Sequence, residues 1–194
     1  METNLIKRCS WCNLKNPLYV AYHDLEWGHI QEDDRYLFEM LLLESFQAGL
    51  SWECVLNKRE HFRIAFDAFD PQRISQYGEE KVAQLLRNPS IIRNRRKILS
   101  AIQNAAVFLD IQKEYGSFWA YLKRFTGDGI IYETGKTTSC LSDRLSADLY
   151  ARGMRFVGST ILYSYLQAIG VIDSHDPTCY LYKQQSDIAD STHH

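Results

Sequence analysis

Histidine and cysteine side chains near both ends of the sequence have the types and spacing of a zinc site. His175 and Cys179 are separated by three residues, which matches one half of a structural zinc site. At the other end, Cys9 and Cys12 form a C-x2-C pair, and Cys9 with His23 forms a wider pair of the same ligand types. Spacing alone favours Cys9 with Cys12, and unconnected free cysteines and surface histidines are the alternative. A complete set of four ligands would be structural, would join both ends of the chain and would contribute to folding.

A second group of residues could bind a flat, positively charged ligand. Glu44 lies in the apolar run 41–46, where an ionised carboxylate is costly unless a partner compensates its charge. Gln47 follows three residues later on the same helix face. Ser51 is a good N-cap, which would hold Trp52 at the first position of the next helix. The alternative is that Trp52 packs in the core and Glu44 is a buried structural hydrogen-bonding group.

Aromatic residues are frequent in the first part of the chain. A base that is flipped out of a nucleic acid needs flat walls and a few hydrogen-bonding groups at its edge. The same residues could instead fill a hydrophobic core. The candidate walls around Glu44 are Trp11, Tyr19, Tyr22, Trp27 and Trp52.

Two connecting segments could approach a ligand through their backbone. Asn88-Pro89-Ser90 must interrupt a helix, and the next helix is expected to open near Ile92 with the most basic stretch of the chain. Free N–H groups at such a helix start suit a phosphate, although a charge run is more often a solvated face. The candidate phosphate contacts are Ser90, Ile91, Arg93 and Lys97. The second segment, residues 152–160, contains two glycines and could also be a plain interhelical turn.

Length and composition restrict the class of protein. The 194 residues suffice for one domain or two small lobes, and 45% hydrophobic with 24% charged residues is ordinary for a globular protein. A net charge of −2 means that any nucleic-acid site must be a local patch. Five widely spread cysteines do not form a disulfide framework, so we expect a reducing, cytoplasmic compartment. We find no signal peptide and no apolar run of membrane-spanning length, so we expect no membrane contact.

The elements that must position these residues are mainly α-helical. Residues 9–28 have no clean period and are predicted to be irregular but packed. Residues 126–139 are predicted to be a loop with an extended piece, no sheet is expected, and residues 183–194 are predicted to be a disordered tail. Helices are predicted over 34–48, 51–66, a short segment after Asp70-Pro71, 81–87, 92–115, 117–125, 142–153 and 159–170.

Taken in order, several motifs resemble the bacterial DNA-3-methyladenine glycosylase I family. The similar stretches are Cys9-Ser10-Trp11, residues 17–28, residues 37–40, residues 47–52, Ile91-Ile92-Arg93-Asn94 with Lys97-Ile98, residues 152–160 and residues 173–179. The resemblance implies a single helix–hairpin–helix glycosylase domain over 1–194, with a zinc clamp joining the terminal segments 9–28 and 171–181. It also implies one structural zinc ion per chain, with Cys12 as a bystander. The implied zinc ligands are Cys9, His23, His175 and Cys179.

The resemblance further implies a base pocket and a reaction. Glu44 and Tyr22 would recognise the base, Trp52 would stack on it, and Trp11, Tyr19 and Trp27 would form walls or supports. The chain would flip 3-methyladenine out of double-stranded DNA and hydrolyse its N-glycosidic bond, leaving an abasic site; we expect a monomer. Ser45-Phe46 and Ser90 depart from the family pattern, which could reshape the pocket floor and the hairpin. The alternatives are a non-catalytic binder of alkylated DNA and a metal-stabilised protein-interaction domain.

Overall fold

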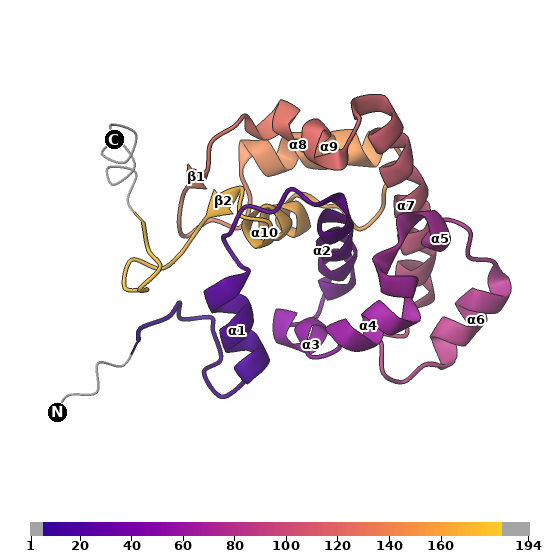
Figure 1. Cartoon of the computed structure of the whole chain (residues 1–194), viewed down its shortest axis with the longest axis horizontal. Helices are drawn as coiled ribbons and strands as arrows, with labels where there is room; N and C mark the ends of the chain where they lie inside the picture. Colours follow the sequence, from indigo (N-terminus) through magenta and orange to yellow (C-terminus); the bar gives the residue numbers. More distant parts are fainter. Residues whose placement is uncertain (1–5, 184–194) are drawn as a thin grey trace.

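A computed structural model describes residues 6–183, and within them the chain is mainly helical (Figure 1). The tail predicted for 183–194 lies, from residue 184 onward, outside the described residues. The helices are α1 (Pro17–Leu25), α2 (Asp34–Gln47), α3 (Trp52–Leu56), α4 (Arg59–Ala65), α5 (Pro71–Ile74), α6 (Glu79–Arg87), α7 (Arg95–Tyr115), α8 (Phe118–Thr126), α9 (Cys140–Ala151) and α10 (Ser159–Ala168), with a 3-10 turn at Asp67–Phe69.

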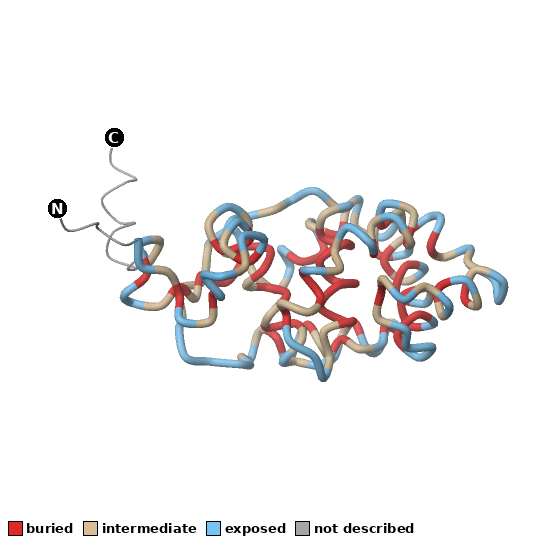
Figure 2. The backbone as a smooth tube through the Cα atoms, turned by 90° about the horizontal axis from the view of Figure 1, so that it is seen from below, coloured by how far each residue is buried: buried red, intermediate tan, exposed pale blue. Residues whose placement is uncertain are grey.

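The central element is α2, and its limits confirm the helix predicted over 34–48. Asp33 caps it by accepting a hydrogen bond from the backbone N–H of Tyr36 at 2.9 Å. Every residue from 37 to 46 is buried, which follows from an apolar sequence around the whole helix. It contacts α3, α7, α8 and α10, and Figure 2 shows buried residues concentrated toward the middle of the molecule.

Several helix limits differ from the prediction. Residues 17–25 form α1 because Asn16 accepts from Leu18 N–H and Pro17 occupies the first turn. The single helix expected over 51–66 is divided into α3 and α4. Ser139 rather than Ser142 is the N-cap of α9, since Ser142 contributes the second half of a capping box. Likewise Gly158, not Ser159, precedes α10.

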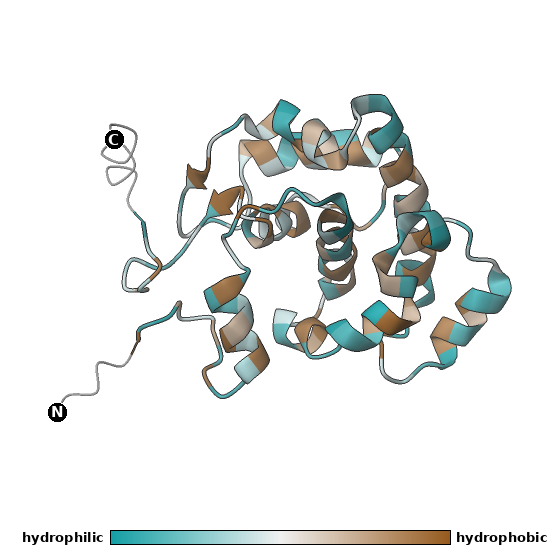
Figure 3. Ribbon diagram, in the orientation of Figure 1, coloured by the Kyte–Doolittle hydropathy of each residue, from teal (hydrophilic) through white to brown (hydrophobic). Residues whose placement is uncertain are grey.

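The segment between α6 and α7 is longer than predicted. Asn94 accepts from the N–H of Lys97 and caps α7, so the helix starts at Arg95 and not near Ile92. Residues 88–94 are therefore a connecting loop between two helices in contact. Figure 3 shows α6 at the edge of the molecule, with both hydrophilic and hydrophobic residues along it.

The two terminal segments lie side by side. A short parallel pair, which the sequence did not predict as a sheet, joins β1 (Ile131–Tyr132) to β2 (Ile172–Asp173). Beyond β2, the N–H of Tyr180 donates to the carbonyl oxygen of Lys7 at 2.9 Å. Arg8 also pairs with Asp24 at 2.7 Å. The Tyr180–Lys7 bond, together with a bond from the N–H of Asp176 to the sulfur of Cys9 at 3.3 Å, brings residues 7–9 against the segment that follows β2. In the part of the chain that the structure covers, no helix combines the length and apolarity needed to cross a membrane.

Candidate active site and metal-ligand cluster

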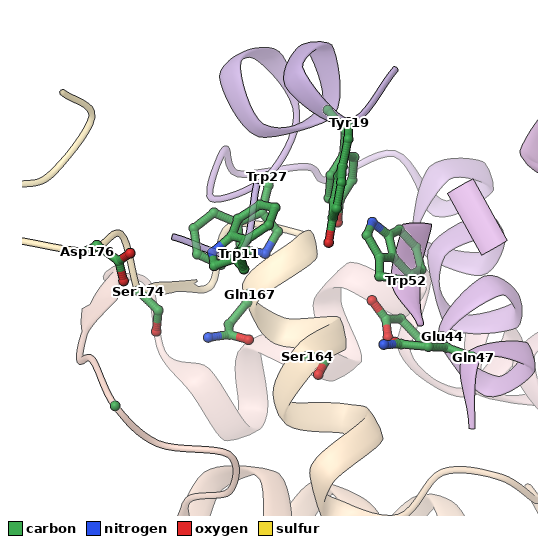
Figure 4. A pocket seen from close by; sticks show the side chains of 12 residues that line it. Trp11, Tyr19, Trp27, Glu44, Gln47, Trp52, Ser164, Gln167, Ser174 and Asp176 are labelled. Carbon is green, nitrogen blue, oxygen red and sulfur yellow. The ribbon is translucent and has the colours of Figure 1, made fainter. Parts of the chain in front are cut away.

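A cavity of about 270 Å³ lies between α1, α2, α3 and α10 (Figure 4). All of the residues predicted as acid, amide and aromatic walls line it. They are Trp11, Tyr19, Tyr22, Trp27, Glu44, Gln47 and Trp52. The structure therefore brings together groups that lie on separate elements.

The acid and the indole meet because of the turn between α2 and α3. Gly49 adopts a φ of 78°, a conformation that favours glycine and that ends α2 sharply. Ser51 then accepts from the N–H of Cys54 at 3.2 Å, which starts α3 at Trp52 as predicted. Glu44 reaches the same cavity from the last turns of α2.

Glu44 is a buried acid whose carboxyl group lies at the cavity. Only 3% of the residue is exposed, and its Oε2 atom makes no hydrogen bond within the described residues. The Nε1 atom of Trp52 is likewise buried and unpartnered. Burial raises the pKa of Glu44 to about 8. Two unsatisfied polar groups at one cavity indicate a site that a ligand completes.

Aromatic rings form the walls. The rings of Tyr22 and Trp52 are 5.3 Å apart and tilted by 45°, whereas Trp11 packs edge-on against Trp27 at 4.8 Å. Tyr19 contacts Trp11 at 5.4 Å. Burial raises the pKa of Tyr22 well above its ordinary value, so its hydroxyl stays neutral and can donate a hydrogen bond.

Sequence reasoning missed the opposite side of the cavity. Ser164 and Gln167 project from α10, three residues apart in the run 161–169 whose other residues are aliphatic or aromatic, which is a signal that could have been used. Ser174 and Asp176 come from the segment after β2. Asp176 accepts from the N–H of Ser10 at 2.6 Å and so links this side to the N-terminal segment.

The residues expected to depart from the family pattern near Glu44 do not form the pocket floor. Ser45 donates from Oγ to the carbonyl oxygens of Leu41 and Phe156. Phe46 packs edge-on against Phe62 at 4.9 Å. Neither residue lines the cavity, so they belong to the packing of α2.

Four buried ligand side chains meet beside the cavity. Their potential ligand atoms all lie within 4.8 Å of one another. The four residues are Cys9, His23, His175 and Cys179. The Sγ atom of Cys12 instead lies 3.8 Å from the carbonyl oxygen of Tyr19, so the C-x2-C pair favoured by spacing is not the pair that meets.

Two carboxylates orient the histidines of this cluster. The Nδ1 atom of His23 lies 2.7 Å from Asp24, and that of His175 lies 2.6 Å from Asp173. Both rings consequently direct Nε2 toward the cysteines, and Nε2 of His175 is buried with no hydrogen-bond partner among residues 6–183. Burial lowers the pKa of His23, which favours the neutral ring that a metal binds. The donor set and its carboxylate supports fit a tetrahedral zinc ion.

The candidate phosphate contacts are only partly on the surface. Arg93 is exposed, but Ile91 is buried and the N–H of Ser90 donates to the side chain of Asn88 at 2.9 Å. Lys97 is only 6% exposed and its Nζ atom donates to the carbonyl oxygens of Phe46 and Ala48, so its role as a phosphate contact stays a prediction. Although Lys97 lies in the first turn of α7, its side chain is directed into the fold and not toward the exposed Arg95 and Arg96 side chains.

Comparison with known proteins decides the family. The family described as methyladenine glycosylase matches residues 11–182. The chain belongs to the methyladenine glycosylase family. Its relatives include DNA-3-methyladenine glycosylase 1 of Escherichia coli (strain K12), 41% identical, with 91% of this chain and 97% of that protein covered. A DNA-3-methyladenine glycosylase of Haemophilus influenzae is 35% identical over 89% of this chain and 96% of that protein.

Solved structures of the methyladenine glycosylase family share this fold. A crystal structure of 3-methyladenine DNA glycosylase I is 42% identical, with a TM-score of 0.87 over 91% of this chain and all of that one. A structure concerning 3-methyladenine recognition by the Staphylococcus aureus enzyme is 31% identical, with a TM-score of 0.86 over 92% of this chain and 97% of that one.

Proposed function

We propose that this methyladenine glycosylase is a monofunctional DNA-repair enzyme that hydrolyses the N-glycosidic bond of 3-methyladenine. The observation that carries the proposal is the unpartnered carboxyl of Glu44 beside Trp52 in an aromatic cavity. The names of the relatives support the same substrate. The enzyme acts on double-stranded alkylated DNA, flips the damaged nucleotide into the cavity and leaves an abasic site.

The cavity recognises the positive charge of the lesion. The ionised carboxylate of Glu44 accepts a hydrogen bond from the exocyclic amine and attracts the cationic base. Trp52 adds a cation–π interaction of about 1–2 kcal/mol in a desolvated site. Tyr22 supplies a neutral hydroxyl, and Gln47 supplies an amide at the base edge. These contacts stabilise the cationic base already in the bound ground state, so they explain why the lesion is selected over normal bases and not how the bond is cleaved faster.

The chemistry of the leaving group reduces what the protein must supply. N-alkylation has already made the base a cation, so it departs as a neutral molecule without a proton from the enzyme. A strong general acid is therefore unnecessary. The chain contributes by holding the flipped nucleotide in one orientation and by excluding bulk water with its aromatic walls.

We propose that the four-residue cluster binds one structural zinc ion. Cys9 and His23 from the N-terminal segment and His175 and Cys179 from the C-terminal segment would hold it. Four protein ligands leave no open position for a catalytic water, so the ion stabilises the fold and does not take part in hydrolysis. The clamp keeps Trp11 and Trp27 against the cavity, since each lies near a ligand in the chain.

We also propose that α6, the loop 88–94 and α7 act as a helix–hairpin–helix DNA contact. Arg93 is exposed on this loop and supplies positive charge to a phosphate. We further propose that the protein acts as a monomer, since one chain supplies all the cavity residues invoked above and all four ligands of the cluster.

The test is release of free 3-methyladenine from alkylated duplex DNA by the purified zinc-loaded protein, measured by chromatography of the released bases. We expect 3-methyladenine in the soluble fraction and a matching number of abasic sites. A non-catalytic binder of alkylated DNA would retain the lesion in the duplex. A metal-stabilised protein-interaction domain would neither release the base nor bind the duplex.

A further inference from the structure

We propose that the groove between α7 and the loop 153–158 binds the sugar–phosphate backbone of a DNA strand, as a contact separate from the hairpin 88–94. The groove has a volume of about 400 Å³ and is lined by Arg96, Leu99, Ser100, Arg155 and Phe156. The inference rests on the proposed function, because it takes DNA as the substrate. It extends that function by adding a contact surface outside the base cavity.

The loop that forms one wall is held in a strained conformation. Phe156 has a φ of 55°, which is unfavourable for a residue with an aromatic side chain. Its carbonyl oxygen accepts from Ser45 of α2 at 3.1 Å. Asn104 of α7 bonds the backbone of Arg155 in both directions, at 2.9 and 2.8 Å. Ser146 of α9 donates to the carbonyl oxygen of Val157 at 2.8 Å.

These hydrogen bonds come from three different helices, which fixes the loop relative to the core. The loop held in this way presents a partly exposed ring and an exposed guanidinium on one side of the groove. A prearranged surface of this kind lowers the entropy cost of binding a ligand.

The charges of the groove match a phosphate strand. Arg96 is exposed, and within residues 6–183 its guanidinium makes no hydrogen bond or ion pair, whereas Arg95 beside it is paired with Glu79 at 2.9 Å. Arg155 donates from Nη1 to the carbonyl oxygen of Met154 at 2.8 Å and lies 4.7 Å from the ring centroid of Tyr150. Nη1 also donates to the carbonyl oxygen of Gly153 at 3.1 Å, while Nε and Nη2 make no hydrogen bond within residues 6–183 and are available to a ligand.

The floor of the groove suits the sugar between two phosphates. Leu99 is 37% exposed, and Phe156 lies beside it. The five lining residues include no acidic side chain. Apolar contact with deoxyribose and ionic contact with phosphate position a protein on DNA without reading its sequence. A protein with a net charge of −2 needs such a local patch.

The groove is continuous with the parts of the molecule proposed to meet DNA. Arg96 lies in the first turn of α7, directly after the loop 88–94. On the other side, the ring centroid of Phe156 is 6.0 Å from Nζ of Lys97. The same Nζ atom is 2.6 Å from the carbonyl oxygen of Ala48, at the turn that leads to Trp52. One DNA strand can therefore pass the hairpin 88–94, then the groove, and then the turn between α2 and α3 that leads to Trp52.

The test measures binding of a fluorescent duplex with a central tetrahydrofuran abasic analogue by anisotropy at several salt concentrations. Arg96→Ala, Arg155→Ala and the double variant are compared with the wild-type protein. Arg144→Ala is the matched control, since Arg144 is an exposed arginine of α9 that stacks on Phe125 at 5.9 Å and does not line the groove. Circular dichroism and thermal unfolding establish that each variant is folded.

Log affinity falls with log salt concentration, and each lost phosphate contact should make this negative slope less steep by about 0.9. A fourfold rise in salt should then weaken wild-type binding about twelvefold more than it weakens binding of the double variant. The Arg144→Ala slope should equal the wild-type slope. An unchanged slope in the folded double variant would overturn the proposed contact. The proposed function has a separate readout, because failure of the wild-type protein to release 3-methyladenine would contradict glycosylase activity whatever the salt slopes show.

Discussion

The Nζ atom of Lys97 lies 2.6 Å from the carbonyl oxygen of Ala48, the residue that ends α2. It also donates to the carbonyl oxygen of Phe46 at 2.8 Å. A cation at a helix C-terminus satisfies carbonyl groups that have no partner within the helix and interacts favourably with its dipole. Lys97 thus ties the start of α7 to the end of the helix that carries Glu44.

We predict that Lys97→Met destabilises the protein by about 1–3 kcal/mol, because buried carbonyl groups lose their donor. Binding of free 3-methyladenine should weaken as well, since the end of α2 positions Gln47 and the turn before Trp52. Denaturant unfolding and quenching of tryptophan fluorescence measure the two effects. Lys113→Met is the control on the same helix, since the Lys113 side chain is 77% exposed. Similar losses in the two variants would refute this role of Lys97.

The ligand set of the metal cluster gives a second prediction. Purified protein should contain one zinc ion per chain, and His23→Ala should lose it. Cys12→Ala should retain zinc, because the Cys12 sulfur lies against the carbonyl oxygen of Tyr19 and outside the cluster. Elemental analysis of both variants after exhaustive dialysis measures the metal content. Zinc retained in His23→Ala but lost in Cys12→Ala would support the C-x2-C pair instead.

A third prediction concerns the carboxylate behind His175. Asp173→Asn should reduce zinc affinity about 10- to 100-fold. A carboxylate can only accept a hydrogen bond, so it keeps the proton of His175 on Nδ1 and leaves Nε2 free for the metal, whereas an amide can also donate and does not enforce this tautomer. Competition with a chelator of known affinity measures this change. Asp110→Asn serves as the control, since the Asp110 side chain is 73% exposed. Equal zinc affinities for the Asp173 variant and the wild-type protein would show that the carboxylate does not orient the ligand.

The raised pKa of Glu44 predicts that the ligand-free protein becomes less stable toward unfolding as the pH rises. The carboxyl has a pKa of about 8 in the folded state and an ordinary value of 4.5. As the pH rises between these values, the unfolded state releases a proton that the folded state retains, so the folded state loses stability. Glu44→Gln should therefore be more stable than the wild-type protein at pH 8 and similar at pH 4. Thermal unfolding at both pH values checks the sign, and a stability difference independent of pH would contradict it.

Local signals in the sequence were sufficient for the central part of the fold. The helix predicted over 34–48 and the N-cap predicted at Ser51 agree with α2 and with the start of α3 at Trp52. The same signals placed Glu44 and Trp52 at one corner, and the structure confirms that both line the cavity. These features depend on backbone groups only a few residues apart, so they can be inferred without knowledge of tertiary contacts.

Features that depend on distant contacts could not be inferred in the same way. Spacing favoured Cys12 as a ligand, but α1 brings His23 to Cys9 and Cys179 instead. The basic run after Pro89 did not reveal that Lys97 faces the carbonyl groups of α2, because those groups lie about fifty residues away in the sequence. Ser164 and Gln167 were missed because the opposite wall of the cavity is formed only when α10 packs against α2.

The central claim is that the cavity selects a cationic base through the charge of Glu44. It can be tested by calorimetric titration of a permanently cationic N-alkylated purine and a neutral isostere, from pH 6 to 9. Since Glu44 must release its proton to pair with the cation, wild-type affinity for the cation should rise about tenfold per pH unit below pH 8 and level off above it. Tyr22 does not titrate in this range, because its pKa is raised far above it.

The decisive measurement is the same titration with Glu44→Gln, which retains the shape and one acceptor but removes the charge. We predict that this variant loses about 1–3 kcal/mol of binding free energy for the cationic purine, the range of charge-assisted hydrogen bonds, and loses the pH dependence. Its affinity for the neutral isostere should change little. Equal losses for the cationic and the neutral ligand would contradict charge-based selection and would show that Glu44 acts through shape alone.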